Sequence, residues 1–214
     1  KSFKVNGAKL GYNQSRDVDV LVTTSAQVGG FFLSFGANNL DLGGATEQFV
    51  IEITGAKGSR ELSFASGTTL TDIAAAINSF TDVTGVTATA SGTGLRIDST
   101  EYGSNNFVSV KVVDDAGITG TSVGIYGLNA NNTTTASTTG YTFTSSTATN
   151  GYRDNGQDIG ATINGIAATS NGRTARINTD FLDVEVTFSD DATNGTAQEL
   201  GAVNAFTITG GGAD

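Results

Sequence analysis

Residues 49–64 read FVIEITGAKGSRELSF, and apolar side chains recur there at every second position. That period places alternate residues on one face of an extended chain, as in a half-buried strand. The segment 55–59, GAKGS, interrupts the alternation, so we predict a hairpin with a longer loop. The side chains expected to face the core are Phe49, Ile51, Ile53, Leu62 and Phe64.

The pattern changes to helical spacing over residues 69–80, which read TLTDIAAAINSF. Thr69 can cap the helix N-terminus, and Asp72 follows in the first turn, where a carboxylate is favourable. The alanines after it have high helix propensity. We therefore predict one short amphipathic helix. Its apolar face would comprise Leu70, Ile73, Ile77 and Phe80.

Alternating runs on both sides of this helix predict further strands. Asn-Gly pairs recur along the chain, which has no proline, and they suit the positive φ angles of tight hairpin turns. The tract 129–150 is rich in Asn, Thr, Ser and Ala, and it predicts either a strand around Tyr141 and Phe143 or a mobile surface loop. The predicted strands lie at 17–23, 31–35, 86–90, 95–98, 107–113, 161–163, 182–188 and 206–209.

These patterns predict a mainly β (β-rich α+β) fold of antiparallel hairpins and meanders with one short amphipathic helix. We expect two subdomains. Residues 45–115, which include the helix, would form one of them. Residues 1–44 and 116–214 would form the second, discontinuous one. The first and last residues look like cut points in a longer protein, and the ends of such an insertion should lie close together.

Residues 85–99 resemble residues 165–179, with Gly, Ala, Thr, Arg and Ile falling in register. Both stretches predict a strand, a turn and a second strand. We interpret them as two related hairpins, one in each subdomain. Convergent β-turn composition is the alternative explanation.

The composition excludes several kinds of site. The chain has 214 residues, 37% of them hydrophobic, and it contains no Cys, His, Trp, Met or Pro. Disulfides, thiolate nucleophiles, a Ser-His-Asp triad and His-ligated metals are therefore impossible. The formal net charge is −10, which disfavours nucleic acid and anionic lipid as partners. No run is apolar over the length needed to span a bilayer.

Several patterns resemble catalytic or metal motifs but lack the context that those motifs need. Residues 120–124 fit G-x-S-x-G without a His base or a strand-turn-helix setting. Asp114-Asp115 and Asp190-Asp191 adjoin turn residues, so solvated turn acids are favoured over a Ca²⁺ site. Glycines 210–212 lack the setting of a phosphate loop. We assign no catalytic, cofactor-binding or metal-binding residue, expect no cofactor, and predict that the chain is not an enzyme.

The stretch from Phe49 to Val113 resembles the flagellin hook IN motif, a repeat of flagellins and hook-associated proteins. The resemblance implies the variable central, surface-exposed (D2/D3-like) region of a bacterial flagellin. Such a region is a non-catalytic structural part of the extracellular flagellar filament, and its partners are neighbouring flagellin protomers. The long terminal helices that build the filament core are absent from this sequence. The matching segments are 49–53, 58–64, 67–78, 85–88 and 95–99.

Other functions stay open. A hook-associated or filament-cap protein would carry the same motif. A cell-surface glycan-binding adhesin could use stacking faces from Tyr12, Tyr102, Tyr126, Tyr141 and Tyr152. N-glycosylation sequons occur at Asn13, Asn131, Asn132 and Asn194, but the resemblance to flagellins favours O-linked glycans on exposed Ser or Thr. Without terminal helices, the chain alone is expected to be monomeric.

Overall fold

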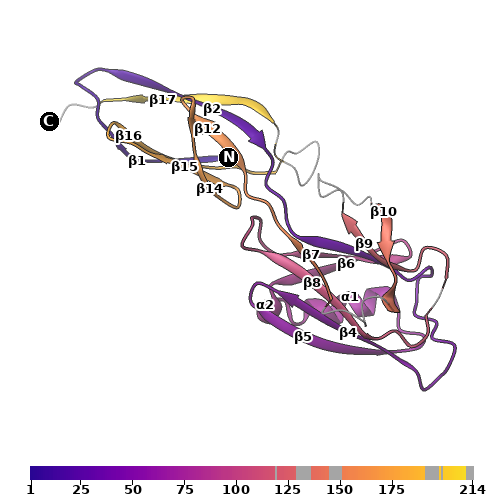
Figure 1. Cartoon of the computed structure of the whole chain (residues 1–214). Coiled ribbons are helices and arrows are strands. Elements are labelled where there is room, and N and C mark those ends of the chain that lie inside the picture. The colour runs from indigo at the N-terminus through magenta and orange to yellow at the C-terminus, as the bar shows by residue number, and fades with distance from the viewer. Residues whose placement is uncertain (119, 129–135, 145–150, 191–197, 199, 211–214) are drawn as a thin grey trace. The chain divides into compact units, whose positions relative to one another are not determined.

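The computed structural model describes residues 1–118, 120–128, 136–144, 151–190, 198 and 200–210. Strands dominate it, and the ladders between described strands are antiparallel, which confirms the predicted fold class. The chain divides into two units (Figure 1). Unit 1 comprises Lys1–Gln27 and Gln157–Asp214, and unit 2 comprises Val28–Gly156. Unit 2 is thus inserted into the sequence of unit 1.

Unit 1 contains two four-stranded sheets, in the orders β1-β16-β15-β14 and β13-β12-β2-β17. Each sheet turns one face of alternating apolar residues inward, as the period of two requires. The buried set includes Val18, Val20, Val22, Ile163, Ile177, Val184 and Val186. The strands are β1 (Ser2–Ala8), β2 (Ser15–Thr24), β12 (Gly160–Ile163), β13 (Ile166–Ala167), β14 (Thr169–Asn171), β15 (Thr174–Asn178), β16 (Leu182–Thr187) and β17 (Gly201–Thr209).

The two lateral sides of unit 1 are closed differently. On one side the backbone passes from β13 to β14 through Ala168 and changes sheet. On the other side β1 and β17 are edge strands, joined by a ring contact of 4.6 Å between Phe3 and Phe206. Phe3 and Val5 lie opposite buried valines of β16 but stay 37% and 44% exposed.

Unit 2 has a five-stranded sheet, β10-β9-β3-β7-β6, and a four-stranded sheet, β11-β8-β4-β5. Helix α1 contacts β6 and β5, the edge strands on one side, and so closes that side (Figure 1). The elements are β3 (Gly30–Ser34), β4 (Gln48–Gly55), β5 (Gly58–Ala65), α1 (Leu70–Asn78), α2 (Thr81–Thr84), β6 (Val86–Ser91), β7 (Gly94–Ser99), β8 (Phe107–Asp114), β9 (Gly124–Leu128), β10 (Ala136–Tyr141) and β11 (Tyr152–Asn155).

Helix α1 forms where the sequence predicts it, but it ends at Asn78, so Phe80 lies beyond its apolar face. The Thr69 hydroxyl accepts a hydrogen bond from the Asp72 N–H (3.2 Å) and donates one to the Asp72 carboxylate (2.7 Å). This cap satisfies one of the free N–H groups at the helix start. The prediction of a single helix is wrong, because a second short helix, α2, follows Phe80. Gly85 ends α2 at a φ of +75°, which glycine adopts without strain.

The hairpin of β4 and β5 also forms, but its turn is shorter than predicted. Gly55 pairs with Gly58, so only Ala56 and Lys57 connect the strands. A Cβ on Gly55 would lie 2.4 Å from the Thr84 carbonyl oxygen. The missing side chain therefore lets α2 approach the strand end, which the alternation of apolar residues cannot reveal.

The observed unit boundaries differ from the predicted ones at 44/45 and 115/116. Strand β3, which precedes the predicted subdomain, pairs with β7 inside it. Strands β9 and β11, which follow it, pair with β3 and β8. Unit 2 therefore extends over 28–156, because its sheets recruit strands from both flanks. The two similar stretches form the hairpins β6–β7 and β14–β15, one in each unit.

Three phenylalanines from distant parts of the sequence meet in the core of unit 2. The ring centroids of Phe35, Phe49 and Phe143 lie 5.2–5.4 Å apart in each pair. All three side chains are buried. Phe143 comes from the low-complexity tract, in which residues 129–135 and 145–150 lie outside the described part. The described piece of that tract contributes to the core as well as forming β10.

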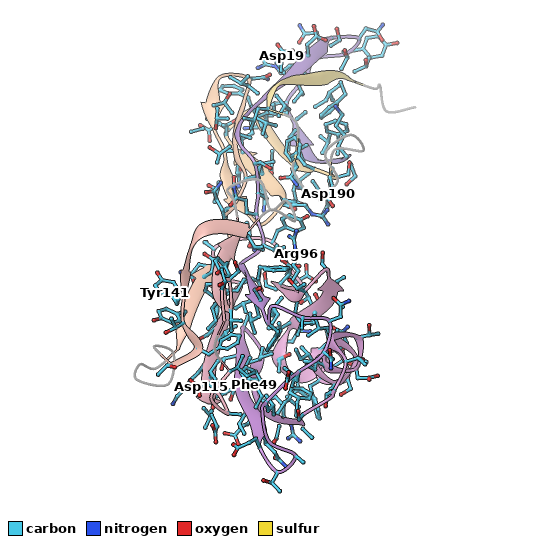
Figure 2. The ribbon with its side chains drawn as sticks, turned by 90° about the vertical axis from the view of Figure 1, so that its right-hand side faces the viewer. Asp19, Phe49, Arg96, Asp115, Tyr141 and Asp190 are labelled. Atoms are coloured by element: carbon cyan, nitrogen blue, oxygen red, sulfur yellow. The ribbon has the colours of Figure 1, made fainter. Side chains whose placement is uncertain are left out.

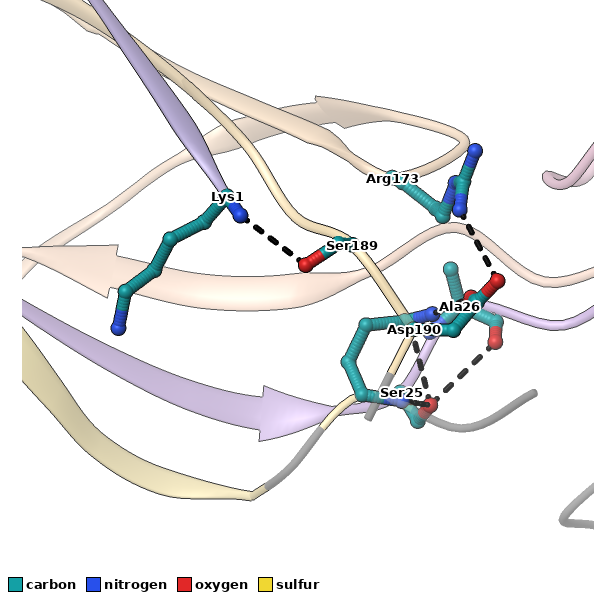
Figure 3. A network of polar contacts seen from close by, with 7 residues as sticks. Lys1, Ser25, Ala26, Arg173, Ser189 and Asp190 are labelled. Atoms are coloured by element: carbon teal, nitrogen blue, oxygen red, sulfur yellow. Dashed lines mark hydrogen bonds and ion pairs between the residues drawn. The ribbon is translucent and has the colours of Figure 1, made fainter. Parts of the chain in front are cut away.

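The two described ends of the chain lie apart, against expectation. The Lys1 amino group donates to the Ser189 hydroxyl (3.0 Å), near the end of β2 (Figure 3). The Gly210 N–H donates to the Gln14 carbonyl, next to the start of β2. A ten-residue strand spans about 33 Å. Both described chain termini belong to unit 1. They therefore lie near opposite ends of strand β2.

Replacing Phe143 with alanine tests its role in the core. We expect Phe143→Ala to lower the free energy of unfolding of unit 2 by about 3–5 kcal/mol, because it removes a buried ring and leaves a cavity. Chemical denaturation measures the change. Tyr12→Ala, at a 76% exposed position, is the control and should have little effect. Equal midpoints for Phe143→Ala and the unsubstituted chain would contradict this account of the core.

Candidate functional site

The residues that resemble a hydrolase motif form no catalytic arrangement. Ser122 is exposed at a φ of +69° in a turn, and strand β9 rather than a helix follows it. Without histidine in the sequence, it has no imidazole to act as base. Asn13 occupies an exposed turn at a φ of +54°. The other sequons and glycines 211–212 lie outside the described residues.

Asp114 and Asp115 act as turn acids, whereas Asp190 accepts from Arg173 and Gln198 instead. Asp114 accepts a hydrogen bond from the Ala116 N–H (2.9 Å). Asp115 accepts from the Gly117 N–H (3.0 Å) and the Thr144 hydroxyl (2.6 Å). Asp115 belongs to unit 2 and Asp190 to unit 1 (Figure 2), while Asp191 is not described. Within the described ranges, no three acidic side chains are grouped to hold a metal ion.

The tyrosines do not gather into one stacking surface. Tyr141 projects at the side of unit 2 (Figure 2) and stacks on Tyr152, with ring centroids 3.8 Å apart. This pair joins β10 to β11, the edge strands opposite the helix side. The Tyr126 ring lies over Gly140, where a Cβ would come within 2.6 Å of it. These rings hold unit 2 together, and Tyr12 lies in unit 1.

The structure reveals a polar network in unit 1 that sequence reasoning missed (Figure 3). Gln198 is 4% exposed, and its side-chain oxygen accepts from the Ala26 N–H (2.7 Å) and the Ser25 hydroxyl (3.1 Å). Its side-chain nitrogen donates to Asp190 (3.0 Å). Asp190 in turn accepts from the Arg173 guanidinium (3.2 Å). One buried amide thus joins the segments after β2 and β16 to the turn before β15.

This network lies where the chain leaves unit 1 and returns to it. Gln27 and Gln157 exchange two backbone hydrogen bonds of 2.8 and 2.9 Å directly beyond Ser25 and Ala26. The Gln157 side chain also donates to the Ser25 carbonyl (2.8 Å). The outgoing and returning segments are therefore fixed to each other within unit 1. These residues follow no periodic sequence pattern. Asp190 is singled out in the sequence because it lies beside Asp191.

Two carboxylates flank the first strand of unit 2. Asp154 accepts a hydrogen bond from the Gly30 N–H (2.8 Å), and a Cβ on Gly30 would lie 2.8 Å from an oxygen of Asp98. Burial raises the pKa of Asp98, and the Arg96 hydrogen bond and charge partly offset the rise. Burial likewise raises the pKa of Asp154, and the Gly30 N–H partly offsets it. Asp154 therefore holds the start of β3, while the Asp98 carboxylate is paired with Arg96.

An open hollow of about 510 Å³ lies on the outer face of β14 and β15. It is lined by Thr, Ser and Asn side chains beside Arg176 and Glu185. Arg176 is engaged by Asp183 through hydrogen bonds of 2.9 and 2.7 Å. These bonds lower the pKa of the Asp183 carboxyl. The hollow has polar groups but no aromatic platform in its lining.

We expect Gln198→Ala to destabilise unit 1 by about 1–3 kcal/mol, because it leaves the buried Ala26 N–H without its acceptor. Denaturant titration followed by hydrogen exchange in unit 1 measures the loss. Gln14→Ala provides a matched control, since Gln14 is exposed and its side chain accepts only from the Gly11 N–H. A loss no larger than that of the control would show that the network contributes nothing to stability.

Asp154→Asn tests the effect of burying a carboxylate in unit 2. A folded-state pKa above the ordinary 3.8 means that ionised Asp154 costs stability, and this cost disappears as pH falls through the raised pKa. The variant should be more stable than the unsubstituted chain at neutral pH, and the difference should shrink toward pH 3.8. Denaturation at several pH values measures it.

Asp183→Asn should change stability in the opposite direction and serves as the control. Ionised Asp183 stabilises unit 1, and this contribution is lost as pH falls below 3.8 through the lowered pKa. The variant should therefore be less stable at neutral pH. A stability gain from Asp154→Asn that grew on acidification would contradict the assigned direction.

No helix in the described ranges has the length and apolar character needed to cross a membrane. The family model of the flagellin hook IN motif matches residues 48–101. The matched segment runs from β4 through α1 to the end of β7 and lies within unit 2. Comparison with curated protein sequences gives no match.

Several solved structures of flagellar cap proteins have a similar fold. FliD from Pseudomonas aeruginosa gives a TM-score of 0.53 at 16% identity, covering 100% of this chain and 85% of that one. The FliD D2-D3 domains from Escherichia coli give 0.52 at 15%, covering 98% of each chain. Those from Serratia marcescens give 0.50 at 18%, covering 98% and 99%. The chain thus carries a flagellin hook IN motif within a fold similar to that of flagellar cap D2-D3 domains.

Proposed function

We propose that this chain is the outer, D2-D3-like part of a structural protein of the bacterial flagellum, and that this protein is a filament cap. The observation that carries the proposal is the position of the hook IN motif, residues 48–101, inside a two-unit fold similar to that of cap proteins. The motif alone favours a flagellin, as the sequence predicts. The fold of the whole chain favours the cap alternative.

The construction of both units supports a structural role. Buried apolar residues and continuous ladders account for their interiors. The polar clusters are engaged in holding segments together, as Gln198 and Asp154 show. The site of action is then the extracellular flagellum, and the partners are other flagellar subunits. The role requires no catalytic chemistry.

Immunogold microscopy with antibodies against this chain tests the proposal on intact flagella. We expect label at the distal tip of each filament, because a cap occupies only that end. A second antibody against the filament's flagellin should label the whole length and serves as the positive control. A strain without the gene controls for non-specific label.

The other label patterns decide between the alternatives. Label along the whole filament would overturn the cap assignment in favour of flagellin. Label at the junction of hook and filament would favour a hook-associated protein. Label on the cell body, away from flagella, would overturn the flagellar proposal and favour an adhesin.

A further inference from the structure

The Asn-Gly pairs of this chain can react chemically within the backbone, apart from any role in turns. Glycine has no Cβ, so its backbone nitrogen can approach the side-chain carbonyl carbon of a preceding asparagine. The folded structure decides which pairs can reach this geometry. Pairs at 150–151 and 194–195 include residues outside the described ranges, which leaves four pairs to compare.

Three of these pairs are held by hydrogen bonds. The Gly156 N–H donates to the Asn106 carbonyl (2.8 Å), so the nitrogen next to Asn155 is engaged. The Gly172 N–H, next to Asn171, donates to Asp158 (2.7 Å). Both glycines are buried.

The third held pair is Asn164-Gly165, where the asparagine side chain is fixed. The Asn164 side-chain oxygen accepts from the Asp19 N–H (2.7 Å), and its nitrogen donates to the Asp17 carbonyl (3.3 Å). Attack on its carbonyl carbon would require both hydrogen bonds to break.

Asn6-Gly7 lies in a different environment. The ladder between β1 and β16 passes from the pair Val5–Val184 to the pair Gly7–Asp183, so Asn6 is the extra residue of a bulge. Both residues of the pair are exposed, and a Cβ on Gly7 would meet nothing within 4 Å. The Asn6 side chain makes one long hydrogen bond, 3.4 Å to Asp183.

We propose that Asn6 is a site of spontaneous deamidation. The backbone nitrogen of Gly7 gives up its proton and attacks the side-chain carbon of Asn6. A carbon–nitrogen bond forms, the bond to the amide nitrogen breaks, and ammonia leaves with a proton from solvent. Water then opens the cyclic imide at either carbonyl, which gives aspartate or isoaspartate. Water is the only co-reactant, and no group is oxidised or reduced.

The product loosens β1. A carboxylate at position 6 cannot donate to Asp183 and places a second negative charge beside it. Isoaspartate also lengthens the backbone within the strand. Beyond its ladder, β1 is held by the Lys1–Ser189 hydrogen bond (Figure 3), the Lys9–Phe181 backbone bond and the Phe3–Phe206 contact. Deamidation at Asn6 therefore weakens the attachment of β1 at the β1–β17 edge. This inference is independent of the proposed function.

Peptide mapping by mass spectrometry after incubation in warm, mildly alkaline buffer tests the site. In the folded chain, Asn6 should convert about tenfold faster than Asn155, Asn164 and Asn171, because its side chain is held by an exposed 3.4 Å bond, whereas each of the other pairs is held by a bond of 2.7–2.8 Å. In denaturant the four should convert at similar rates. Gly7→Ala should slow conversion at Asn6 without disturbing the fold. Conversion of Asn6 no faster than that of Asn164 or Asn171 in the folded chain overturns the proposal.

Hydrogen exchange of the Asn6→Asp variant tests the consequence. The amides of Ser2–Ala8 should lose protection several-fold, while those of β15 and of unit 2 keep theirs. Asn164→Asp is the matched control for an added charge at an Asn-Gly turn, and it should leave β1 unchanged. Unaltered protection of β1 in Asn6→Asp would overturn the claim that deamidation loosens this edge.

Discussion

Strand β3 is paired on both sides, and the architecture of unit 2 depends on this. Phe31 lies opposite Ile97 of β7 and Leu33 opposite Leu95, and all four side chains are buried. The other side of β3 pairs with β9. Burying side chains of this size contributes about 1.5–3 kcal/mol each. Without β3 the hook IN motif would retain the β6–β7 hairpin but lose the centre of its larger sheet, and Phe49 would lose the layer that holds Phe35.

The lateral edges of the two units are closed in different ways. In unit 2 helix α1 covers one side and the Tyr141–Tyr152 stack joins the other. In unit 1 the chain itself closes one side by changing sheets. Among the described residues, the contact between Phe3 and Phe206 joins the strands of the β1–β17 edge, and the bulge at Asn6 lies on β1. Exposed edge strands can pair with other chains, and bulges and lysines such as Lys4 oppose this.

Local pattern predicted the elements whose partners are near in sequence. The hairpin from Phe49 to Phe64 and the helix capped by Thr69 both form, because alternation, helical spacing and capping are encoded within a few residues. Local pattern does not reveal the boundaries of unit 2, since the pairing of β3 with β7 joins distant residues, such as Phe31 and Ile97. The sequence leaves open whether Phe143 lies in a strand or a loop, because the tract around it has no periodic pattern. Gln198 has no local signal, because the backbone group that its side-chain oxygen accepts from belongs to Ala26, 172 positions away.

We infer that the hook IN motif folds only with both of its flanks. Separate expression of residues 28–156 and 45–115, followed by cooperative denaturation and hydrogen exchange, tests this directly. Residues 28–156 should unfold cooperatively with protected amides in β3, β4 and β7. Residues 45–115 should lack a cooperative transition, because β3, β9 and β11 are missing. A cooperative, protected fold in 45–115 alone would contradict the account.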